Sequence, residues 1–468
     1  MQQHSDAALS VTGVCADSRA VRRGDAFFAL PGVHVHGNRF VDDAVARGAA
    51  MLVTDTRPDK DPGVPVIVVP DVRAAFAKAA ARSVGALPST LVGVTGTNGK
   101  TSVVSFVRQI WNHCGIASAS LGTLGVDTGH RIEGGSLTTP DSLTLAHQLA
   151  ALKADGIDHV AMEASSHGLD QRRLDGLAFK AVGFTNLTRD HLDYHETFDN
   201  YREAKLRLFR DLLADGGAAV VNTDDPEHLP FMFAALERGA TLLTVGSEGA
   251  FISVDEVTSE ALGQRVRGRL VGEPMDFHLP LAGQFQVSNA LVAVALAIAG
   301  GAPQERAVAA LEHLKGAKGR LELAGRKGDV AVFIDYAHTP DALKTALEAL
   351  RPFARSKVTV VFGCGGDRDK GKRPLMGAIA SDLADRVIVT DDNPRSEDAA
   401  TIRREILAEA PGAEEIGDRA EAIRAAVAGA RQGDVVLVAG KGHEDYQIVG
   451  ETRLHFSDHE TVRVALEG

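Results

Sequence analysis

The sequence has few cysteines, no long apolar run and fewer basic than acidic residues. Its three cysteines, Cys15, Cys114 and Cys364, lack metal-ligand spacing and do not suggest a disulfide framework. The longest apolar stretch, Ala290–Ala299, is too short to span a bilayer, and residues 1–6 do not begin a signal peptide. The net charge of -12 argues against a nucleic-acid or anionic-membrane partner. We therefore expect a cytoplasmic protein that does not insert into a membrane.

The composition is that of a globular protein with several domains. Hydrophobic residues make up 44% and charged residues 24% of the 468 residues, a length typical of two to four domains. Turn residues at 85–90 mark the end of the first domain. A second boundary is expected near residue 319, where a new series of strands and helices begins. The predicted domains are therefore 1–88, 89–318 and 319–468.

Residues 91–102 combine an apolar strand, a glycine turn and the start of a helix. Backbone N–H groups of such a turn converge on a phosphate, Lys100 adds positive charge, and Thr101 can hold Mg²⁺. The usual nucleoside-triphosphate loop has about four residues between its glycines, so this loop is a variant. The alternative is a glycine turn before an ordinary helix. Because lysine and threonine follow in register, we predict an ATP site that comprises Gly96, Thr97, Asn98, Gly99, Lys100, Thr101 and Ser102.

Strands and helices alternate along the chain, which predicts an α/β fold in three domains. These are a small N-terminal α/β domain, a central P-loop ATPase-type domain with a mostly parallel sheet, and a C-terminal Rossmann-like domain. The predicted strands are 25–30, 50–54, 64–69, 91–94, 159–164, 179–185, 218–222, 330–334, 358–362, 386–390 and 434–439. The predicted helices are 40–47, 72–84, 100–111, 198–213, 283–299, 342–350, 375–384, 399–409 and 419–430.

Polar side chains follow two predicted strands of the central domain, at the sheet edge where chemistry gathers in parallel sheets. Glu163 lies at the end of one strand, and His191 follows what we take to be its neighbour. Both could hold a divalent cation beside the loop, although imidazole is an unusual magnesium ligand. The alternative is that Glu163 caps a helix and His191 only hydrogen-bonds within a loop. Lys205 lies on a charged amphipathic helix and, taken alone, is most simply a solvated lysine.

Two places near the second boundary have the character of nucleotide contacts. Asp335 ends a predicted strand and could hold a ribose hydroxyl, and His338 could contact a base or a phosphate. Arg320 could reach phosphates when the domains close, or could form an interdomain ion pair. The glycines at 363–366 lack dinucleotide spacing and are not followed directly by a helix, so NAD is not expected.

Three charged loops, 366–373, 392–395 and 440–444, follow predicted strands of the C-terminal domain. They should therefore lie along one edge of its sheet. Guanidinium groups bind carboxylates and a glutamate accepts from an ammonium, so two arginines with a glutamate suit an acidic amino acid with its own amine. Charged loops usually face water, so the prediction depends on the alignment of all three.

Taken together, these motifs resemble the Mur ligases, ATP-dependent amide-forming enzymes of peptidoglycan assembly. The resemblance rests on residues 95–101, 138–140, 163–167, 335–340 and 440–444, and it covers essentially the whole chain. It implies that ATP phosphorylates a carboxylate of a UDP-linked peptide. An amine then attacks the acyl phosphate, giving amide, ADP and phosphate. The activity would serve cell-wall biogenesis, and through it cell shape and division.

The resemblance implies a role for each loop residue of the central domain. Lys100 and Thr101 would bind phosphate and Mg²⁺, and Glu163 and His191 would bind a second Mg²⁺. Lys205 matches the lysine that the family carbamylates to N6-carboxylysine. A carbamate is a carboxylate, able to hold metal where an ammonium would repel it. The implied catalytic residues are Lys100, Glu163, His191 and Lys205, and the implied nucleotide contacts beyond the loop are Asn289, Arg320, Asp335 and His338.

The resemblance also assigns the UDP-linked substrate, UDP-N-acetylmuramoyl-L-Ala-D-Glu. Its implied contacts, with the uridine side in the small domain, are Ser18, Thr138, Thr139, Ser165, Gln171 and Arg173. The loop with His34, His36 and Asn38 has no firm match. That loop, like the stretch around Ser18, either faces solvent or contacts ligand. We expect the protein to act as a monomer on small molecules.

The added amino acid is indicated by Asp392, Asn393, Pro394 and Arg395, the family's diaminopimelate signature, from which lysine-adding relatives differ. Arg368 and Arg395 would clasp the distal carboxylate of meso-diaminopimelate, with Gly440 and Glu444 at its distal amine. Lysine lacks that carboxylate and would leave two buried arginines unpaired, at about 2–5 kcal/mol. The expected reaction is addition of meso-diaminopimelate to D-Glu, with L-lysine as the alternative amino acid.

Two other classes of protein have a similar loop. A GTPase would carry an Asn-Lys-x-Asp stretch, which the sequence lacks, and a small-molecule kinase would not need the carboxylate clasp of a third domain. A non-catalytic nucleotide-gated module would bind ATP without turnover. That class leaves Glu163, His191 and Lys205 without a role.

Overall fold

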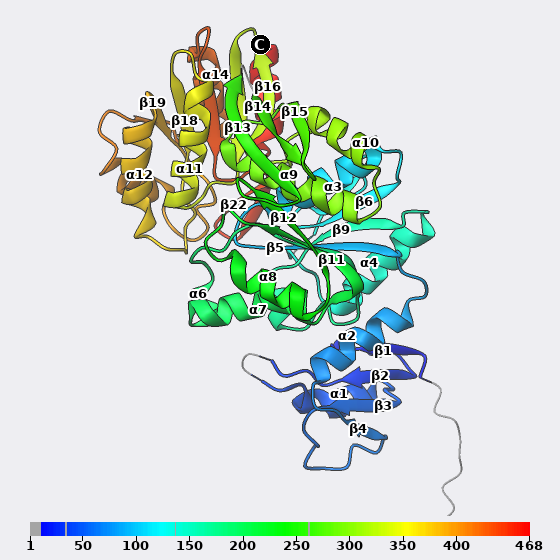
Figure 1. Ribbon diagram of the computed structural model, residues 1–468. Coiled ribbons are helices and arrows are strands. Elements are labelled where there is room, and N and C mark those ends of the chain that lie inside the picture. The colour runs from blue at the N-terminus through cyan, green and yellow to red at the C-terminus, as the bar shows by residue number, and fades with distance from the viewer. Residues whose placement is uncertain (1–10, 33–34, 136, 261–262) are drawn as a thin grey trace, which may run out of the picture. The chain divides into compact units, whose positions relative to one another are not determined.

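The computed structural model describes residues 11–32, 35–135, 137–260 and 263–468. The prediction for residues 1–6 and the one for His34 lie outside these ranges. The chain forms two compact units, residues 1–245 with 295–304, and residues 246–294 with 305–468. Helices and strands alternate in both (Figure 1), as the α/β prediction requires. Within the described ranges, no helix is long and apolar enough to cross a membrane.

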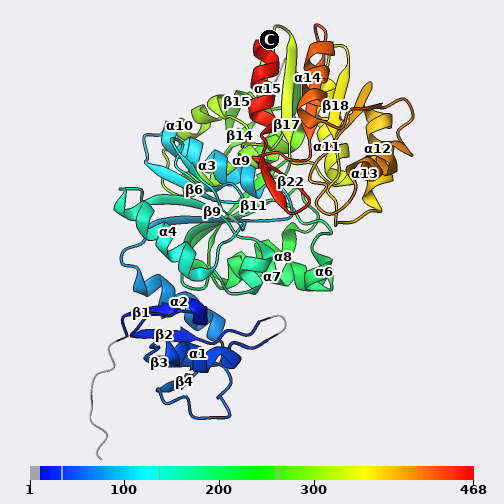
Figure 2. The ribbon, with the colours of Figure 1, turned by 180° about the vertical axis from the view of Figure 1, so that it is seen from behind.

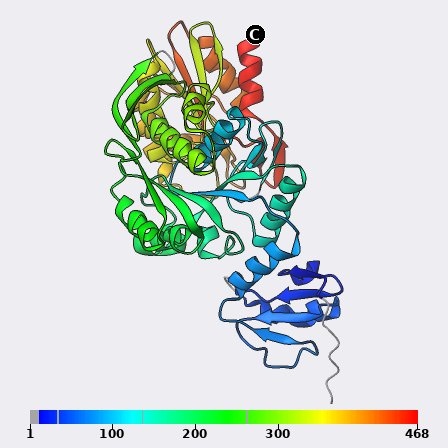
Figure 3. The ribbon, with the colours of Figure 1, turned by 45° about the vertical axis from the view of Figure 1, so that its right-hand side comes forward.

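The first unit begins with a parallel sheet of four short strands, drawn in blue in Figure 3. Its strands are β1 (Gly13–Cys15), β2 (Asp25–Phe28), β3 (Met51–Thr54) and β4 (Val66–Val68), paired in that order. Its helices are the 3-10 turns η1 (Ser18–Ala20) and η2 (Gly37–Phe40), α1 (Val41–Ala46) and α2 (Val72–Ser83). The predicted helix at 40–47 is therefore shorter than expected and is preceded by a 3-10 turn.

The large sheet of the first unit is mostly parallel, as predicted. Its strands occur in the order β12-β11-β10-β5-β9-β6-β7-β8, and only β7 and β8 run antiparallel to their neighbours. The strands are β5 (Thr90–Thr95), β6 (Ser118–Gly122), β7 (Gly125–Asp127), β8 (Ile132–Glu133), β9 (His159–Glu163), β10 (Phe179–Phe184), β11 (Leu213–Asn222) and β12 (Thr241–Gly246). The loop-bearing strand β5 lies between β9 and β10. Its central place explains why β5 is buried along its whole length.

Helices cover both faces of this sheet. They are α3 (Lys100–His113), α4 (Ser142–Ala154), α5 (Ser166–Asp170), α6 (Leu192–His195), α7 (Phe198–Arg210) and α8 (His228–Glu237). Figures 1 and 2 show α7 and α8 on one side of the sheet and α3 on the other. Leu149 of α4, Phe209 of α7 and Phe231 of α8 share one core with Met162 of β9. This apolar packing holds the strand ends that carry the polar residues.

The second unit begins with a three-stranded antiparallel segment that the sequence did not predict. It comprises β13 (Ile252–Glu260), β14 (Gly263–Leu270) and β15 (Glu273–Leu279). The predicted helix at 283–299 follows as α9 (Gln284–Ala299), whose last residues belong to the first unit. The short helices α10 (Gln304–Ala309) and η3 (Ala310–His313) come next.

The main sheet of the second unit has the order β16-β17-β21-β18-β19-β20, and only β16 is antiparallel to its neighbour. Its strands are β16 (Glu322–Lys327), β17 (Val330–Asp335), β18 (Val358–Phe362), β19 (Arg386–Val389), β20 (Glu414–Glu415) and β21 (Val435–Ala439). A hairpin follows, β22 (Tyr446–Val449) and β23 (Thr452–His455). The predicted strands at 330–334, 358–362, 386–390 and 434–439 are confirmed.

Two apolar cores lie on the two faces of this sheet. The helices α11 (Pro340–Leu350), α12 (Lys372–Leu383) and α13 (Ala399–Leu407) pack on one face. The 3-10 turn η4 (Arg351–Phe353) directly follows α11. The helices α14 (Arg419–Gly429) and α15 (Asp458–Glu467) pack on the other (Figure 2). Because α12 begins only at Lys372, the glycines at 363–366 are not followed directly by a helix, as the sequence indicated.

Candidate active site

The glycine turn after β5 has the geometry of a phosphate-binding loop. Gly96 (φ 148°) and Gly99 (φ 85°) both have positive φ, and α3 begins at Lys100 directly after them. A Cβ on Gly96 would lie 1.9 Å from the hydroxyl oxygen of Thr185, so only glycine fits there. The Lys100 ammonium donates to the carbonyl oxygens of Gly96 (2.9 Å) and Thr97 (2.7 Å). The predicted loop is therefore confirmed in conformation, with its lysine folded over it.

Side chains from the neighbouring loops fix the turn in place. The Thr97 hydroxyl lies 3.1 Å from the Tyr201 hydroxyl and accepts from the backbone N–H of Thr188 at 2.9 Å. The backbone N–H of Asn98 donates to Oδ1 of Asn186 at 2.9 Å. The loop is thus held in shape by the strand end of β10 and by α7, before any phosphate is bound.

Glu163 is buried beside the start of α3, with 1% of its surface exposed. Its Oε1 accepts from the Thr101 hydroxyl at 3.0 Å and from the backbone N–H of Thr123 at 2.7 Å. The helix cap after β9 is Ser165, which accepts from the backbone N–H of Gly168, so the alternative role of Glu163 as a cap is wrong. A carboxylate and a hydroxyl 3.0 Å apart at this loop are oxygen donors of the kind that Mg²⁺ prefers, so the site fits that ion.

The structure corrects the predicted relation between Glu163 and His191. They do not follow neighbouring strands, because β5 lies between β9 and β10. His191 sits seven residues beyond the end of β10 with positive φ (52°), and its side chain is 48% exposed. Its ring packs against that of His167 at 4.9 Å between centroids. In the described ranges no group of three or more His, Cys, Asp or Glu side chains is placed to hold a metal.

Lys205 is not the solvated lysine that its helix suggested. It is 1% exposed, donates to the Gly96 carbonyl at 2.7 Å and lies 4.4 Å above the Tyr201 ring. Burial, reinforced by the charge of Lys100, lowers the pKa of Lys205 well below its usual value. The sequence missed this burial because Arg202, Glu203 and Arg207 surround Lys205 in the chain, whereas in space it lies on the inner face of α7.

Five of the residues that the resemblance assigns to the UDP-linked substrate lie in loops and turns beside the large sheet, and they form one hydrogen-bonded group. The Thr139 hydroxyl donates to the Glu163 carbonyl and accepts from the Ser165 hydroxyl, both at 3.0 Å. Arg173 donates to the Thr139 carbonyl (2.6 Å) and to Oε1 of Gln171 (2.7 Å). Thr138 joins through its hydroxyl, 3.1 Å from that of Thr123.

Ser18 lies on η1, in the first small sheet, and is buried. Its hydroxyl hydrogen-bonds Asp43, which lowers the pKa of that carboxyl. In the loop without a family match, His36 pairs with Asp55 at 2.9 Å and Asn38 accepts from the Thr54 hydroxyl at 2.9 Å. These contacts give His36 and Asn38 a role in shaping the small domain.

The predicted nucleotide contacts of the second unit gather around Tyr336. Asp335 accepts from the backbone N–H groups of Leu321 (2.6 Å) and Ala337 (2.7 Å), and burial raises its pKa to about 6. The Arg320 guanidinium lies 4.9 Å from the Tyr336 ring centroid, and the His338 ring lies 4.7 Å from it. The cation over an aromatic ring is a stabilising arrangement. Asn289, on α9, donates to Oε1 of Gln286, whose amide contacts the Arg320 carbonyl at 3.5 Å.

The three charged loops of the second unit lie together at one edge of its sheet, as predicted. Arg395 donates to the Gly366 carbonyl at 2.8 Å, which joins the first two loops. Asn393 donates to Oε2 of Glu444 at 3.1 Å, which joins the second loop to the third. Gly440 has positive φ (115°), and a Cβ there would lie 2.7 Å from Oδ2 of Asp392.

The arginines of the predicted clasp are less buried than expected. Arg368 is exposed and Arg395 is half-buried, so neither is an unpaired buried cation in this structure. Arg395 has positive φ (52°), rare for a residue with a Cβ, and Pro394 precedes it. The strained turn directs the Arg395 guanidinium back to the first loop.

Three further buried or half-buried residues hold the site residues in place and were not predicted as site residues. In the first unit Thr123 holds Glu163. In the second unit Lys441, within the third loop, contacts the second loop. Arg373, at the end of the first loop and with a 0% exposed side chain, donates to Glu397, Glu405 and the Gly365 carbonyl. Thr123 stands in a Gly-Thr-Leu-Gly turn, a signal that could have been noticed. Lys441 and Arg373 stand inside the charged motifs, where the sequence gives no sign that they are buried.

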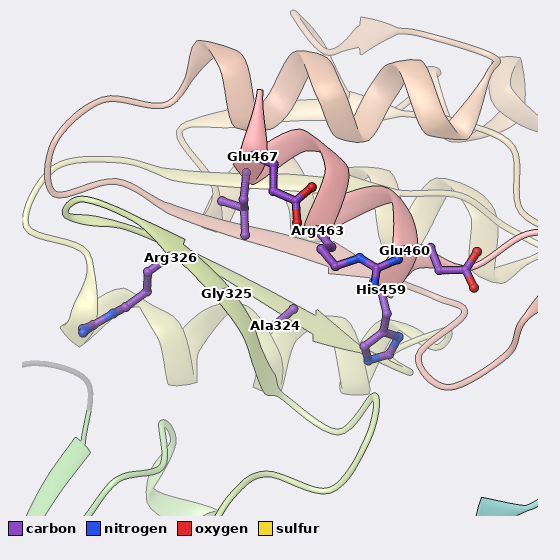
Figure 4. Close-up of a pocket in the computed structure, with 8 residues that line it drawn as sticks. Ala324, Gly325, Arg326, His459, Glu460, Arg463 and Glu467 are labelled. Carbon is purple, nitrogen blue, oxygen red and sulfur yellow. The ribbon is translucent and has the colours of Figure 1, made fainter.

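A separate depression of about 460 Å³ lies on the second unit between β16 and α15. Figure 4 shows the Arg326 side chain pointing away from His459 there. None of its lining residues belongs to the predicted site, and its charged side chains Arg326, Glu460 and Arg463 face solvent. It therefore adds nothing to the candidate active site.

Comparison with known proteins agrees with this geometry. Residues 10–84 match the model of the Mur ligase family catalytic domain, residues 94–297 the Mur ligase middle domain, and residues 319–442 the Mur ligase glutamate ligase domain. The three matches follow the predicted domain order.

Whole-chain relatives are similar at high identity. A protein from Chelativorans sp. (strain BNC1) is 55% identical over 98% of this chain and 95% of its own length, and one from Bradyrhizobium diazoefficiens is 54% identical over 98% and 96%. Both are named UDP-N-acetylmuramoyl-L-alanyl-D-glutamate--2,6-diaminopimelate ligase. A solved structure of a ligase with the same name is 34% identical, with a TM-score of 0.74, and covers 97% of this chain and 94% of that one. The chain belongs to the Mur ligase family.

Proposed function

We propose that the protein is an ATP-dependent ligase that adds meso-2,6-diaminopimelate to the D-Glu of UDP-N-acetylmuramoyl-L-Ala-D-Glu. The observation that carries this proposal is the identity of 54–55% to relatives named for that reaction, along nearly the whole chain. The edge of the second unit's sheet, where Arg395 and Glu444 stand on adjoining loops, supports the same amino acid. Addition of L-lysine is not favoured, because lysine has no distal carboxylate for an arginine.

The phosphate loop and its neighbours are assigned to ATP. The backbone N–H groups of the turn and the Lys100 ammonium hold the phosphates, and Thr101 and Glu163 hold Mg²⁺. When bound, Mg²⁺ withdraws charge from the phosphate oxygens. Asn289, Arg320, Asp335 and His338 are assigned to the rest of the nucleotide, and Arg320 supplies a positive charge for its phosphates.

Lys205 is assigned as a carbamylated metal ligand, together with His191. CO₂ reacts with a neutral amine, and burial lowers the pKa of Lys205, which favours the neutral form relative to an exposed lysine. In the described residues Lys205 forms no ion pair with a carboxylate, and its ammonium is held by a backbone carbonyl beside Lys100. An isolated buried cation is unfavourable, and a carbamate would replace it with the charge that a metal requires.

The group around Thr139 is assigned to the UDP-linked peptide, and Ser18 to its uridine end. Thr138, Thr139, Ser165, Gln171 and Arg173 lie in one network, which touches Glu163 through the Thr139 hydroxyl. The groups that we assign to the peptide therefore lie beside the carboxylate that we assign to Mg²⁺. We assign residues 1–88 to binding the UDP-linked substrate, 89–318 to ATP and 319–468 to the amino acid.

The reaction follows from these roles. A carboxylate oxygen of the D-Glu residue attacks the γ-phosphorus of ATP, the bond to ADP breaks, and an acyl phosphate forms. The neutral amine of diaminopimelate then attacks the acyl carbon, phosphate leaves and one proton is released. The site's task is to place three substrates and to balance the phosphate charge. We place the reaction in the cytoplasm, where ATP and UDP-linked precursors are made, and we assign it to a monomer.

The test is phosphate release measured with purified protein, ATP, Mg²⁺, UDP-N-acetylmuramoyl-L-Ala-D-Glu and meso-diaminopimelate. Release should require every component, and mass spectrometry should find the amide product in a one-to-one ratio with phosphate. Release that continues without diaminopimelate would indicate an ATPase or a kinase. ATP binding with no release in the complete mixture would indicate a non-catalytic binding module.

A further inference from the structure

Lys441 is a fully buried lysine of the third loop, one of the loops that are assigned to the amino acid. Its side chain is 0% exposed, and its ammonium donates to Oδ1 of Asn393 (3.0 Å) and to the carbonyl of Tyr446 (2.6 Å). Oδ1 of Asp392 lies 3.6 Å away and Oε2 of Glu444 lies 3.9 Å away. A buried ammonium is retained only with such partners. Lys441 therefore ties its own loop, the third, to Asp392 and Asn393 of the second loop.

Lys441 and the backbone of Ile448 together determine how the Asn393 amide is oriented. Oδ1 of Asn393 accepts from two donors, the Lys441 ammonium and the backbone N–H of Ile448, both at 3.0 Å. A flipped amide would turn its NH₂ group toward both donors, so that orientation is excluded. The NH₂ group must face the other way, where it donates to Oε2 of Glu444 at 3.1 Å.

Glu444 is consequently fixed from two sides. Asn393 holds Oε2, and the Tyr336 hydroxyl donates to Oε1 at 3.4 Å. The carboxylate of Glu444 keeps acceptor capacity for a further donor, since each carboxylate oxygen can accept two hydrogen bonds. A ligand ammonium is the donor that its charge favours.

The charges around Lys441 favour binding of a cation at Glu444. Behind Lys441, Arg419 and Asp458 form an ion pair in which both side chains are 0% exposed, and Arg419 also donates to the Ala439 carbonyl at 3.0 Å. Besides Lys441 and Arg419, this group contains three anions, Asp392, Glu444 and Asp458. Glu444 is the least buried of the three, with 16% of its side chain exposed, so it is the carboxylate that a ligand cation can reach.

We infer that Lys441 is a positioning residue for recognition of the ligand's distal amine: it fixes the Asn393 amide and, through it, the carboxylate of Glu444. The inference rests on the proposed function for the identity of the amino acid. It assigns the two charged groups at the distal end of the ligand to different residues. Arg395 recognises the distal carboxylate, whereas the chain Lys441–Asn393–Glu444 recognises the distal amine.

The test compares meso-diaminopimelate with 2-aminopimelate, which keeps the distal carboxylate and lacks the distal amine. In the Lys441→Met variant, kcat/KM for diaminopimelate should fall by about 10- to 100-fold, the usual range for a residue that orients a ligand-binding group. The value for 2-aminopimelate should change little, so the preference between the two should collapse. The KM values for ATP and for the UDP-linked substrate should be unchanged.

Two further variants make this test decisive. Lys344→Met, an exposed lysine on α11, is the matched control and should keep the wild-type preference. Asn393→Leu removes the middle of the chain while keeping Lys441, and it should cause the same collapse if Lys441→Met does not fold. In the double variant the two effects should not add, because both act through Glu444.

The outcomes that would overturn the inference differ from those that would overturn the proposed function. If the wild type does not use diaminopimelate, the proposed function fails. A crystal structure of Lys441→Met then still decides the inference, which requires Asn393 and Glu444 to have moved. If the wild type is active and both variants keep the full preference for diaminopimelate, Lys441 has only a structural role.

Discussion

The phosphate loop of the first unit and the amino-acid loops of the second unit are organised in different ways. Glu163 and Lys205 are each 1% exposed and lie directly beside the loop that we assign to ATP. Arg368 is exposed and Arg395 half-buried, although the same loops also contain buried charges such as Lys441. Glu163 and Lys205 therefore lie in the interior, whereas the two arginines of the other site are accessible.

The difference follows from what each site has to do. Charge that develops during phosphoryl transfer is best stabilised by groups that are already fixed and shielded from water. An incoming amino acid must enter and leave, so the groups that meet it lie on accessible loops. The buried charges of those loops then hold the accessible groups in place. Variants of the two regions should consequently fail in different ways.

The largest effect is expected at Lys205. Lys205→Ala should lower kcat by about 10²–10³-fold, as loss of a preorganised charge-stabilising group does, while the fold and ATP binding persist. Lys180→Ala, an exposed lysine on β10, is the matched control. The intact mass of the wild type should include one added CO₂ per chain under native conditions. Full activity of Lys205→Ala would remove the carbamate from the account.

The second-largest effect is expected at Arg395, which is half-buried, in comparison with Arg368, which is exposed. Arg395→Ala should cost about 2–5 kcal/mol in kcat/KM for diaminopimelate, because the ligand carboxylate loses a charged partner. Arg368→Ala should cost less, since its guanidinium is already solvated. KM for ATP should not change in either variant. Arg424→Ala on α14 is the exposed control. Equal losses at Arg368 and Arg395 would contradict the role given to burial.

A smaller effect is expected at Thr123, which supports Glu163 in the first unit. Thr123→Val removes the hydroxyl that lies 3.3 Å from Oε2 of Glu163 but keeps the backbone N–H. Mg²⁺ affinity, measured from the Mg²⁺ dependence of turnover, should fall by about tenfold, within the range for groups that orient a metal ligand. Thr123→Ser retains the hydroxyl and should behave as the wild type. A loss in Thr123→Ser equal to that in Thr123→Val would show that packing, and not the hydrogen bond, is responsible.

The smallest effect concerns pH and Asp335. The pKa of Asp335 is raised to about 6 in the folded protein, so the folded state binds this proton more tightly than the unfolded state does. The stability from this group is present below pH 4 and is lost as pH rises to about 6. Asp335→Asn should abolish that loss. The change in Tm from pH 4.5 to pH 7 should therefore be about 2–4 °C more favourable in the variant than in the wild type. Asp341→Asn, at the exposed start of α11, should leave the pH dependence unchanged.

Much of the fold was predictable because parallel β/α segments have a strong periodic pattern. The strands at 91–94, 159–164 and 358–362 are short apolar runs, and all are confirmed. The antiparallel strands β13 and β14 were missed because one face is exposed and charged, as at Glu256 and Arg267, so no apolar run marks them. The order of strands in the sheet is set by tertiary packing and cannot be read from the sequence. For this reason the prediction that Glu163 and His191 follow neighbouring strands was wrong.

The loops of the candidate site could be predicted from the sequence, whereas the burial of its charged side chains could not. The glycines, lysine and threonine of 96–101 have a spacing that directly reflects backbone geometry. Burial of a charged residue has no such signature, because a lysine in a charged motif looks the same whether it points inward or outward. Lys205 and Lys441 therefore required the structure, and Arg368 was predicted as buried for the same reason.

The most direct test of the account is a competition between meso-diaminopimelate and L-lysine in one reaction with ATP, Mg²⁺ and UDP-N-acetylmuramoyl-L-Ala-D-Glu. The ratio of the two amide products, measured by mass spectrometry, reports the choice of amino acid independently of the overall rate. We predict product from diaminopimelate in large excess, and a sharply reduced excess in Arg395→Ala. An excess of the lysine product from the wild type would contradict both the proposed substrate and the role of Arg395.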